Sequence, residues 1–401
     1  MPGIKASAIP LYLPPEEAVV DSGMDKNVFF GAISMYIREK VPFLKNMPVF
    51  LDKLFDSAPM LRMAAKRAGT TRTEGLEEMT LNMIKGENAF PEKELRRLVD
   101  YLCKDGKPDI IHLSNALIIG LARQLKRKMD VKIVCSLLNE DDWINEMAEP
   151  FQSDAWKLIA REAPNVDAFL TPSKYYKNFF ISKTGITEIN FYVVPLGLDP
   201  DHELLNVVKK DNWPAIGYFC RINSHNGFDK LVDAFIKLKL KDSLPGLTLH
   251  VSGGYTGDDK SFIAEQIRKV KEAGLKSFIR IYPEFHGNSK QQFFSNIDVM
   301  SVPVRKYDGY GLYLLEANAA GIVVVQPSTG AFPEIIARTG GGVTYSPDNI
   351  DELADCLIKV LNDKELLLKL GSIGKENVLK NLSLDKMSEG LSSVYNLVMS
   401  K

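Results

Sequence analysis

Short runs of apolar, largely β-branched residues alternate with segments of helical periodicity along most of the chain. In the first half, segments such as ALIIGLARQLKRK separate the apolar runs and repeat apolar residues every three or four positions. Continuous apolar strands with intervening helices are typical of a parallel sheet that is covered on both faces. The strands predicted for this half are residues 5–15, 108–115, 131–138, 166–173 and 190–197.

The same alternation restarts after a polar, punctuated connection at residues 197–213. Two amphipathic helices, at residues 227–241 and 258–274, lie between the apolar runs of this second half. The glycine cluster TGGGVTY, residues 339–345, leads into a strand and has a structural role. The other strands predicted for this half are residues 214–222, 247–253, 276–283, 296–303 and 321–328.

The connection predicts two domains of similar size. The first covers residues 1–197 and is joined by a C-terminal amphipathic helix at residues 384–401, and the second covers residues 198–383. The pattern of each domain is typical of an open α/β unit, so we expect two tandem Rossmann-like domains that face each other across a cleft. Ligands bind such sheets beyond the carboxyl ends of their strands, which is where we look for chemistry.

Composition narrows the class of protein. The 401 residues are 45% hydrophobic and 25% charged, as in soluble globular proteins, and the formal net charge of −1 gives no electrostatic footprint for nucleic acid. The four cysteines form no CxxC pair, and no P-loop or helix-opening GxGxxG is present. We find neither a signal peptide nor a run of about 18 apolar residues, so we expect a cytoplasmic protein.

A carboxylate interrupts an otherwise apolar helix pattern late in the chain. In RKYDGYGLYLLEANAAG, Asp308 follows a predicted strand and a helix is predicted to begin near Leu312. Gly309 and Gly311 would let the backbone approach a ligand and expose amide donors at the helix N-terminus. Glu316 lies about one turn into the helix, where an unpaired carboxylate is costly. Its partner is either a vicinal diol such as a ribose or a neighbouring Lys or Arg in a structural salt bridge.

The segment DGYGLYLLEANAAG resembles the nucleotide-sugar signature of the retaining GT-B glycosyltransferases, especially glycosyltransferase family 4 (group 1). In that signature an acid, seven residues and a Glu frame the donor, and here Asp308 replaces the usual first Glu. VVVQPSTGAFPEII, PDIIHLSN, VDAFLTPSKYYKNFF, NFYVVPLGLDP and IGYFCRI...GFDKLVDAF match other parts of the family in order and spacing. The resemblance covers most of the chain and implies a GT-B fold whose C-terminal helix packs back on the first domain.

The resemblance implies a role for each matching residue of the donor site. Asp308 would contact hydroxyls of the transferred sugar, beside the amides of the four residues that follow it. Glu316 would hold the ribose, and Arg221 would neutralise the diphosphate, which gains charge as the glycosidic bond breaks. FFGAISMYIREK resembles the family's glycine loop, with Gly31 beside the phosphates and the acceptor. The implied nucleotide-binding residues are Gly31, Arg221, Asn226, Gly309, Tyr310, Gly311, Leu312 and Glu316.

The chain departs from the family pattern at three positions. The family usually has a second diphosphate-binding Lys five residues after the Arg, and here that position is Asn226. Loss of one cation would cost about 2–4 kcal/mol of transition-state stabilisation unless another group replaces it. Leu138 stands where the family often has a His, and Ala32 replaces the second glycine of the first loop. Candidate replacements for the missing cation are His225, Lys230 and Arg305.

Three residues of the first half are candidates for the acceptor side. His112 lies at the carboxyl end of a predicted strand, where it either contacts substrate or is buried and satisfied by backbone. Glu140 and Asp141 open a predicted helix, where acids complement the helix dipole. For these two acids, helix capping is the alternative to acceptor binding.

A basic amphipathic stretch bears on the partners. Residues 35–72 combine apolar spacing with excess Lys and Arg, so they either pack on their own sheet or make peripheral contact with an anionic membrane and reach a lipid acceptor. The sequence contains no metal-ligand spacing, and the resemblance implies no required metal. The nucleotide (UDP, GDP or ADP), the acceptor (a small molecule, glycan or lipid-linked molecule) and the oligomeric state stay open.

The sequence therefore predicts a retaining, metal-independent glycosyltransferase that uses a nucleoside-diphosphate sugar. Arg221 and the helix amides would stabilise the leaving group, with Asp308 on the sugar and Glu316 on the ribose. One alternative is a non-catalytic relative that binds a nucleotide-sugar or carbohydrate, which Asn226 and Leu138 favour. Another is a nucleotide-sugar epimerase, which would need no acceptor. Retention of Glu316 and of the glycine turn favours transfer.

Overall fold

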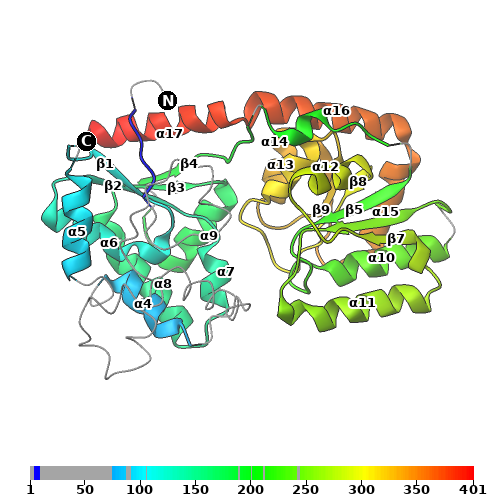
Figure 1. The fold of residues 1–401 in the computed structure, drawn as a ribbon, viewed down its shortest axis with the longest axis horizontal. Coiled ribbons are helices and arrows are strands. Elements are labelled where there is room, and N and C mark those ends of the chain that lie inside the picture. Colours follow the sequence, from blue (N-terminus) through cyan, green and yellow to red (C-terminus); the bar gives the residue numbers. More distant parts are fainter. Residues whose placement is uncertain are drawn as a thin grey trace. The chain divides into compact units, whose positions relative to one another are not determined.

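The structure, a computed structural model, divides into two compact units (Figure 1). The first holds the described residues up to Thr171, with Phe179–Tyr192 and Ser392–Lys401, and the second holds Pro172–Asn178 and Val193–Leu391. The described residues are 4–9, 75–86, 92–104, 106–187, 190–199, 201–210, 213–241 and 244–401.

The first unit is built on a sheet whose strands have the order β1-β2-β3-β4. β2 pairs in parallel with both β1 and β3, and β3 is buried along its whole length. The strands are β1 (Ile110–Leu113), β2 (Lys132–Ser136), β3 (Ala168–Thr171) and β4 (Phe191–Val193). The helices around them are α4 (Glu77–Lys85), α5 (Glu92–Leu102), η3 (Ala116–Ile118), α6 (Gly120–Lys128), α7 (Glu140–Asn145), α8 (Phe151–Glu162), η4 (Ala163–Asn165) and α9 (Lys174–Thr184).

The second unit contains a six-stranded parallel sheet with the order β10-β9-β8-β5-β6-β7. The strands are β5 (Ala215–Phe219), β6 (Thr248–Ser252), β7 (Ile279–Ile281), β8 (Val299–Met300), β9 (Val323–Pro327) and β10 (Gly342–Tyr345). The helices are η6 (Glu203–Asn206), α10 (Phe228–Leu240), η7 (Gly257–Asp259), α11 (Lys260–Glu272), η8 (Lys276–Phe278), α12 (Gly287–Ser295), α13 (Leu312–Ala319), α14 (Phe332–Thr339), α15 (Ile350–Asn362) and α16 (Lys364–Asn381). The last helix, α17 (Leu384–Met399), begins in this unit, and its residues from Ser392 belong to the first.

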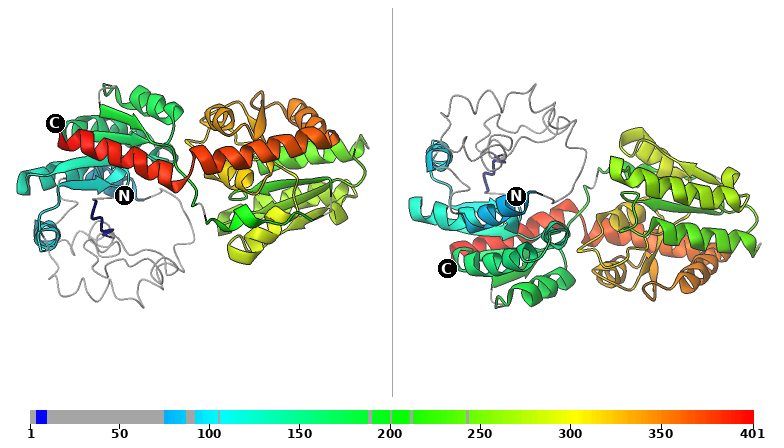
Figure 2. Two further views of the ribbon diagram at one scale, coloured as in Figure 1. Left: turned by 90° about the horizontal axis from the view of Figure 1, so that it is seen from above. Right: turned by 90° about the horizontal axis from the view of Figure 1, so that it is seen from below.

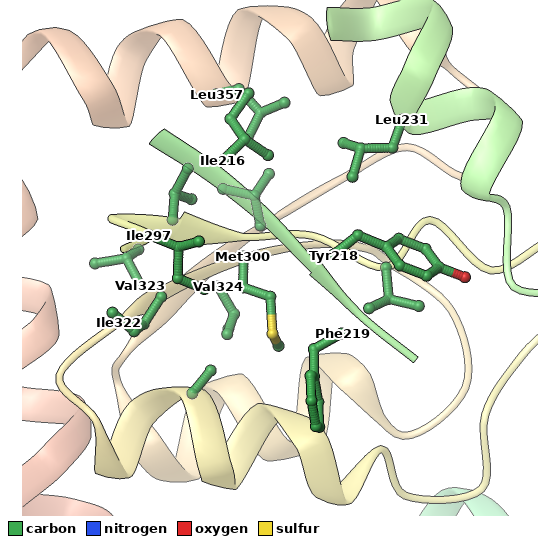
Figure 3. Packing of buried hydrophobic residues seen from close by; sticks show 14 of the residues in the cluster. Ile216, Tyr218, Phe219, Leu231, Ile297, Met300, Ile322, Val323, Val324 and Leu357 are labelled. Atoms are coloured by element: carbon green, nitrogen blue, oxygen red, sulfur yellow. The ribbon is translucent and has the colours of Figure 1, made fainter. Parts of the chain in front are cut away.

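Helices cover both faces of this second sheet, which is why β5 and β9 are buried at every position. Figure 2 shows α16 over the sheet in the view from above and α10 with α11 in the view from below. In Figure 3, Leu231 of α10 and Leu357 of α15 lie on one side of β5, and Phe219 lies on the other. Phe219 packs there against two rings of α12, Phe293 and Phe294.

The predicted fold class is confirmed, and most of the predicted strands form. The glycine cluster leads into β10, and α13 begins at the predicted Leu312. Residues 4–9, the described start of the predicted first strand, have no regular structure. The remainder of that strand, Gly31 and residues 35–72 lie outside the described residues.

A buried histidine in β6 couples this core to pH. His250 contacts the hydroxyl of Tyr282 through Nδ1 (2.9 Å) and that of Thr248 through Nε2 (3.2 Å). Burial, with the positive charges of Arg280 and Lys209, lowers the pKa of His250 from 6.5 to about 4. The unfolded chain therefore binds a proton at His250 near pH 6.5, whereas the folded chain binds it only near pH 4. Stability from this group is complete above pH 6.5 and falls as the pH drops toward 4.

We expect the free energy of unfolding to fall between pH 7 and pH 5 by about 2 kcal/mol more in the wild type than in a His250→Gln variant. Urea unfolding at the two pH values measures this difference. An exposed histidine of the same unit provides the control, because His286→Gln should keep the wild-type drop. An identical drop in His250→Gln would contradict the assignment.

Candidate functional site

The strand order of the second unit creates a switch point between β5 and β8. From β5 the chain moves outward through β6 and β7, then returns to β8 on the other side of β5. The loops that leave the carboxyl ends of β5 and β8 therefore run in opposite directions, and a crevice between such loops is where open α/β sheets bind ligands. Arg221 lies in the first of these loops, and Asp308 lies in the second.

The two loops are in direct backbone contact. Gly227, at the start of α10, has a left-handed φ of 70°, and a Cβ at this position would overlap the carbonyl oxygen of Pro303. The amide of Arg305 donates to the carbonyl of His225 at 3.0 Å. Only glycine allows this approach, so Gly227 fixes how the loops that carry Arg221 and Asp308 meet.

Arg221 is held by an acid that sequence reasoning did not identify. Its Nε lies 3.0 Å from Oδ2 of Asp259, and its side chain is 36% exposed. A guanidinium N–H of Arg221 also donates to Oγ1 of Thr256 at 2.9 Å. Burial acts to raise the pKa of Asp259, but hydrogen bonds from Thr256 and the Arg221 guanidinium lower it below its usual value. The carboxylate therefore stays charged and fixes the direction of the guanidinium.

Asn226, which replaces the family's usual Lys, has a structural role in the same loop. Its side-chain amide donates to the carbonyl of Arg221 at 3.0 Å, and its backbone amide donates to Oδ1 of Asn223 at 2.8 Å. The hydroxyl of Tyr218 donates to the same Arg221 carbonyl at 3.0 Å. Asn226 therefore holds the backbone of the Arg221 loop.

Two of the candidate replacement cations already pair with acids. Arg305 holds both carboxylate oxygens of Asp229, and this pairing raises the pKa of Arg305. Lys230 pairs with Asp348. The third candidate, His225, accepts the backbone bond from Arg305 through its own carbonyl.

Hydrogen bonds to the Asp308 side chain and to the residues that follow it hold the turn that begins at Asp308. One carboxylate oxygen of Asp308 accepts from the amide of Tyr310 at 2.8 Å, and the other accepts from the hydroxyl of Tyr313 at 3.2 Å. Burial, followed by the charge of Asp308, raises the pKa of Tyr313, so its hydroxyl keeps its proton. The carbonyl of Gly309 accepts from Ser173, and the hydroxyl of Tyr310 donates to the carbonyl of Leu196.

The glycine of this turn starts α13 as the sequence predicts. Gly311 is the N-cap with φ 75°, and a Cβ there would press on the ring of Phe332. Leu312, the first residue of the helix, is 40% exposed. Of the amides in this first turn, that of Leu314 donates to the carbonyl of Gly311 at 2.9 Å. The amides that precede it lie at the positive end of the helix dipole, where an anion is favoured.

Glu316 has a protein partner, Lys290 of α12. Oε1 of Glu316 lies 2.7 Å from Nζ of Lys290, and the two side chains are only 13% and 14% exposed. This is the salt-bridge alternative that the sequence left open. The ion pair lies beside the end of β5, with Nζ 5.5 Å from the ring centre of Phe219.

The acceptor-side candidates lie in the first unit and already have partners. The ring nitrogens of His112 contact the hydroxyls of Tyr395 (2.7 Å) and Ser136 (2.8 Å). Desolvation by the surrounding protein lowers the pKa of His112 from 6.5 to about 4. Glu140 and Asp141 are buried in the first turn of α7, and Oε1 of Glu140 accepts from the amide of Ala116 at 2.9 Å.

Two features of the site, the pair Thr256–Asp259 and the side chain of Lys290, were not predicted from the sequence, for different reasons. Thr256 and Asp259 form a capping box, whose three-residue spacing before an amphipathic helix is a readable signal. Lys290 gives no such signal, because its partner lies 26 residues further along the chain.

In the part of the chain that the structure describes, neither a cluster of metal ligands nor a membrane-spanning helix is present. There, no three His, Cys, Asp or Glu side chains gather as metal ligands would. Within the same residues, no helix combines the length and the apolar character needed to span a bilayer.

Comparison with known families accounts for both halves of the chain. Residues 81–202 match the model for Glycosyltransferase Family 4, and residues 205–377 match that for Glycosyl transferases group 1. Over these two matches, the chain is similar to the glycosyltransferases of Family 4 and of group 1. The match to group 1 includes the whole switch point, from Arg221 to Glu316.

Among the curated relatives of this chain is the lipopolysaccharide core biosynthesis mannosyltransferase LpsB of Rhizobium meliloti. It is 29% identical over 208 residues, which are 51% of this chain and 54% of LpsB. A GDP-mannose-dependent α-(1-6)-phosphatidylinositol monomannoside mannosyltransferase of Mycobacterium tuberculosis is 22% identical over 59% of this chain and 64% of its own length. The chain thus spans between half and two thirds of the length of these relatives.

Solved structures of GT-B glycosyltransferases share the fold of this chain. The Anabaena protein Alr3699/HepE in complex with UDP superposes with a TM-score of 0.65 at 14% identity, covering 82% of this chain and 97% of HepE. Sucrose-phosphate synthase from Thermosynechococcus elongatus gives a TM-score of 0.62 at 18% identity, covering 77% and 79% of the two chains.

We expect Gly227→Ala to destabilise the second unit by at least about 2 kcal/mol more than Gly274→Ala. Both glycines have left-handed backbones, with φ of 70° and 74°, so each alanine carries a similar backbone strain of about 1–2 kcal/mol. Open space surrounds Gly274, whereas the methyl group at position 227 would push against Pro303. Urea unfolding of the two variants measures the difference, and equal costs would show that the loops can separate freely.

Proposed function

We propose that this chain transfers a sugar from a nucleoside-diphosphate sugar to an acceptor with retention of anomeric configuration. The observation that carries the proposal is the switch point of the second unit. There, Arg221, the exposed start of α13 and the carboxylates of Asp308 and Glu316 come from the loops and helices that follow β5 and β8. This is a cationic group, an anion-binding helix end and two hydroxyl acceptors, as a nucleotide-sugar requires.

Each group has one task in this mechanism. The bond between the anomeric carbon and the diphosphate oxygen breaks, and Arg221 with the α13 amides stabilises the charge on the departing phosphate. The acceptor oxygen bonds to the same face of the sugar and loses its proton to that phosphate. Asp308 accepts hydrogen bonds from the sugar, and Glu316 accepts them from the ribose. Because these fixed charges already act on the phosphate, we expect turnover to persist in the presence of a chelator.

The relatives favour particular substrates for the first trials. GDP-mannose appears in the name of one curated relative, and UDP and UDP-glucose are bound in HepE structures. The relatives' names point to lipid-linked and glycan acceptors, namely phosphatidylinositol mannoside and lipopolysaccharide core. GDP-mannose and UDP-glucose are therefore the first donors to test, with mannosylated lipid acceptors.

A second candidate function is donor binding without turnover. The cation that the family usually places at position 226 is absent, and both Arg305 and Lys230 are paired with acids. With Arg221 also paired to Asp259, leaving-group stabilisation rests on fewer charges. Binding of a nucleotide-sugar that is never hydrolysed or transferred would identify this alternative.

We expect the matching nucleotide to raise the thermal midpoint of the wild type, and to stabilise Glu316→Gln only about half as much, because losing one hydrogen bond to a charged group weakens binding about tenfold. A ligand at a hundredfold excess over its Kd adds about 2.7 kcal/mol of stability. UDP, GDP and ADP are screened by thermal shift, each compared with the ligand-free form of the same variant. Asp308→Asn is the control, since it should keep the nucleotide shift and lose turnover of the nucleotide-sugar. If none of the nucleotides stabilises the wild type, the donor-site assignment fails.

We expect Arg221→Gln to weaken binding of the nucleoside diphosphate by about 10- to 100-fold, because a charge-assisted contact to phosphate is lost. Binding of the parent nucleoside, which has no phosphate, should change little. Calorimetry on the diphosphate and the nucleoside separates the two effects. Arg268→Gln removes the same charge from an exposed ion pair on α11 and serves as the control. Equal weakening of both ligands would place Arg221 outside the phosphate site.

A further inference from the structure

The ion pair between Lys290 and Glu316 joins two helices at the carboxyl edge of the central strands. Lys290 lies in the first turn of α12, and Glu316 lies in the second turn of α13. Both helices follow strand ends, and the Phe219 ring beside Nζ marks the end of β5. The pair therefore lies at the carboxyl edge of the sheet, where the switch point is located.

An ion pair is an inefficient way to stabilise α13. Moving both charges out of water carries a desolvation cost that their attraction only roughly offsets, and apolar residues of similar volume often serve as well or better. The neighbours of Glu316 in this helix, Leu314, Leu315 and Ala317, are buried and apolar. A carboxylate kept among such residues is better explained by use as an acceptor than by packing.

The geometry of the pair leaves half of the carboxylate available. Lys290 donates to Oε1, and among the described residues Oε2 of Glu316 accepts no hydrogen bond. With Oε1 held at 2.7 Å by a side chain that is itself only 14% exposed, the carboxylate plane has little freedom to turn. The nearby ring of Phe219 restricts the ammonium further through its π face.

We propose that Lys290 is a positioning residue for ribose recognition: its ammonium fixes Oε1 of Glu316 so that Oε2 accepts a ribose hydroxyl. The role rests on the proposed nucleotide-sugar site. Lys290 acts through Glu316 and makes no contact with the sugar or the diphosphate. Its signature is therefore the ratio of the affinities for a ribonucleotide and its deoxy analogue, which a purely structural residue would leave unchanged.

The experiment compares binding of the nucleoside diphosphate (UDP or GDP) with that of its 2′-deoxy and 3′-deoxy forms by calorimetry. The wild type should prefer the ribonucleotide by about tenfold or more, the effect of losing a hydrogen bond to a charged group. Lys290→Met should bring this ratio close to one, as Glu316→Gln does, while Lys290→Arg retains most of it. Adding Lys290→Met to Glu316→Gln should change the ratio no further, because the two residues act as one unit.

Controls separate this role from damage to the fold. Lys269→Met removes the same charge from an ion pair with Asp233 elsewhere in the unit and should keep the wild-type ratio. Lys290→Met leaves the carboxylate unpaired and lowers stability, so the double variant with Glu316→Gln, which removes both charges, supplies a folded comparison. Thermal midpoints of all variants are measured in parallel.

The outcomes distinguish the two levels of the proposal. A ratio lost in Glu316→Gln but kept in Lys290→Met overturns the positioning role and leaves the ribose assignment standing. A wild type that binds the ribo and deoxy forms equally overturns the role of Glu316, and with it that of Lys290. A wild type that binds no nucleoside diphosphate overturns the proposed function itself.

Discussion

The backbone of Gly227 lies against the carbonyl of Pro303, closer than any side chain at that position allows. This contact joins the loop after β5 to the loop after β8, and the bond from the Arg305 amide to the His225 carbonyl continues it. Because the strand order sends the two loops in opposite directions, the contact between Gly227 and Pro303 fixes the relative positions of the side chains that the loops carry. Arg221 is six residues before Gly227, and Asp308 is five residues after Pro303, so both inherit their place from it.

What the sequence predicted well is local in the chain. Apolar runs gave the strands because both faces of a parallel sheet are buried, and the Asp308–Glu316 segment was readable because one loop and one helix turn hold it together. Contacts between distant segments left no periodic signal. The pairs Arg221–Asp259 and Lys290–Glu316, and the two hydroxyls that contact His112, depend on how the strands are ordered. The sequence spacing alone indicated that Glu316 needs a partner but did not identify that partner.

The charges around the switch point are arranged as pairs. Arg221 with Asp259, Arg305 with Asp229 and Lys230 with Asp348 each set a cation against an acid. Such pairing offsets the charge of each cation and directs it, while Asp308 accepts hydrogen bonds from an amide and a hydroxyl. Under the proposed function, a diphosphate would therefore bind to the oriented guanidinium of Arg221 and to the amides at the start of α13, with little contribution from a general positive field.

Position 226 shows how a lost charge can be exchanged for order. A Lys there would add a cation for the diphosphate on a long mobile stem, whereas the short side-chain amide of Asn226 donates to the carbonyl of Arg221. The backbone amide of residue 226, which a Lys would share, donates to Asn223. Tyr218 donates to the Arg221 carbonyl from the core side. Three hydrogen bonds thus hold the loop, and one of them, from the Asn226 side chain, depends on the residue type at position 226. Arg221 starts from a defined backbone position, and Asp259 then defines its side chain. Because the backbone and the side chain of Arg221 are fixed by separate groups, under the proposed function one rigidly placed guanidinium would serve where the family usually has two cations.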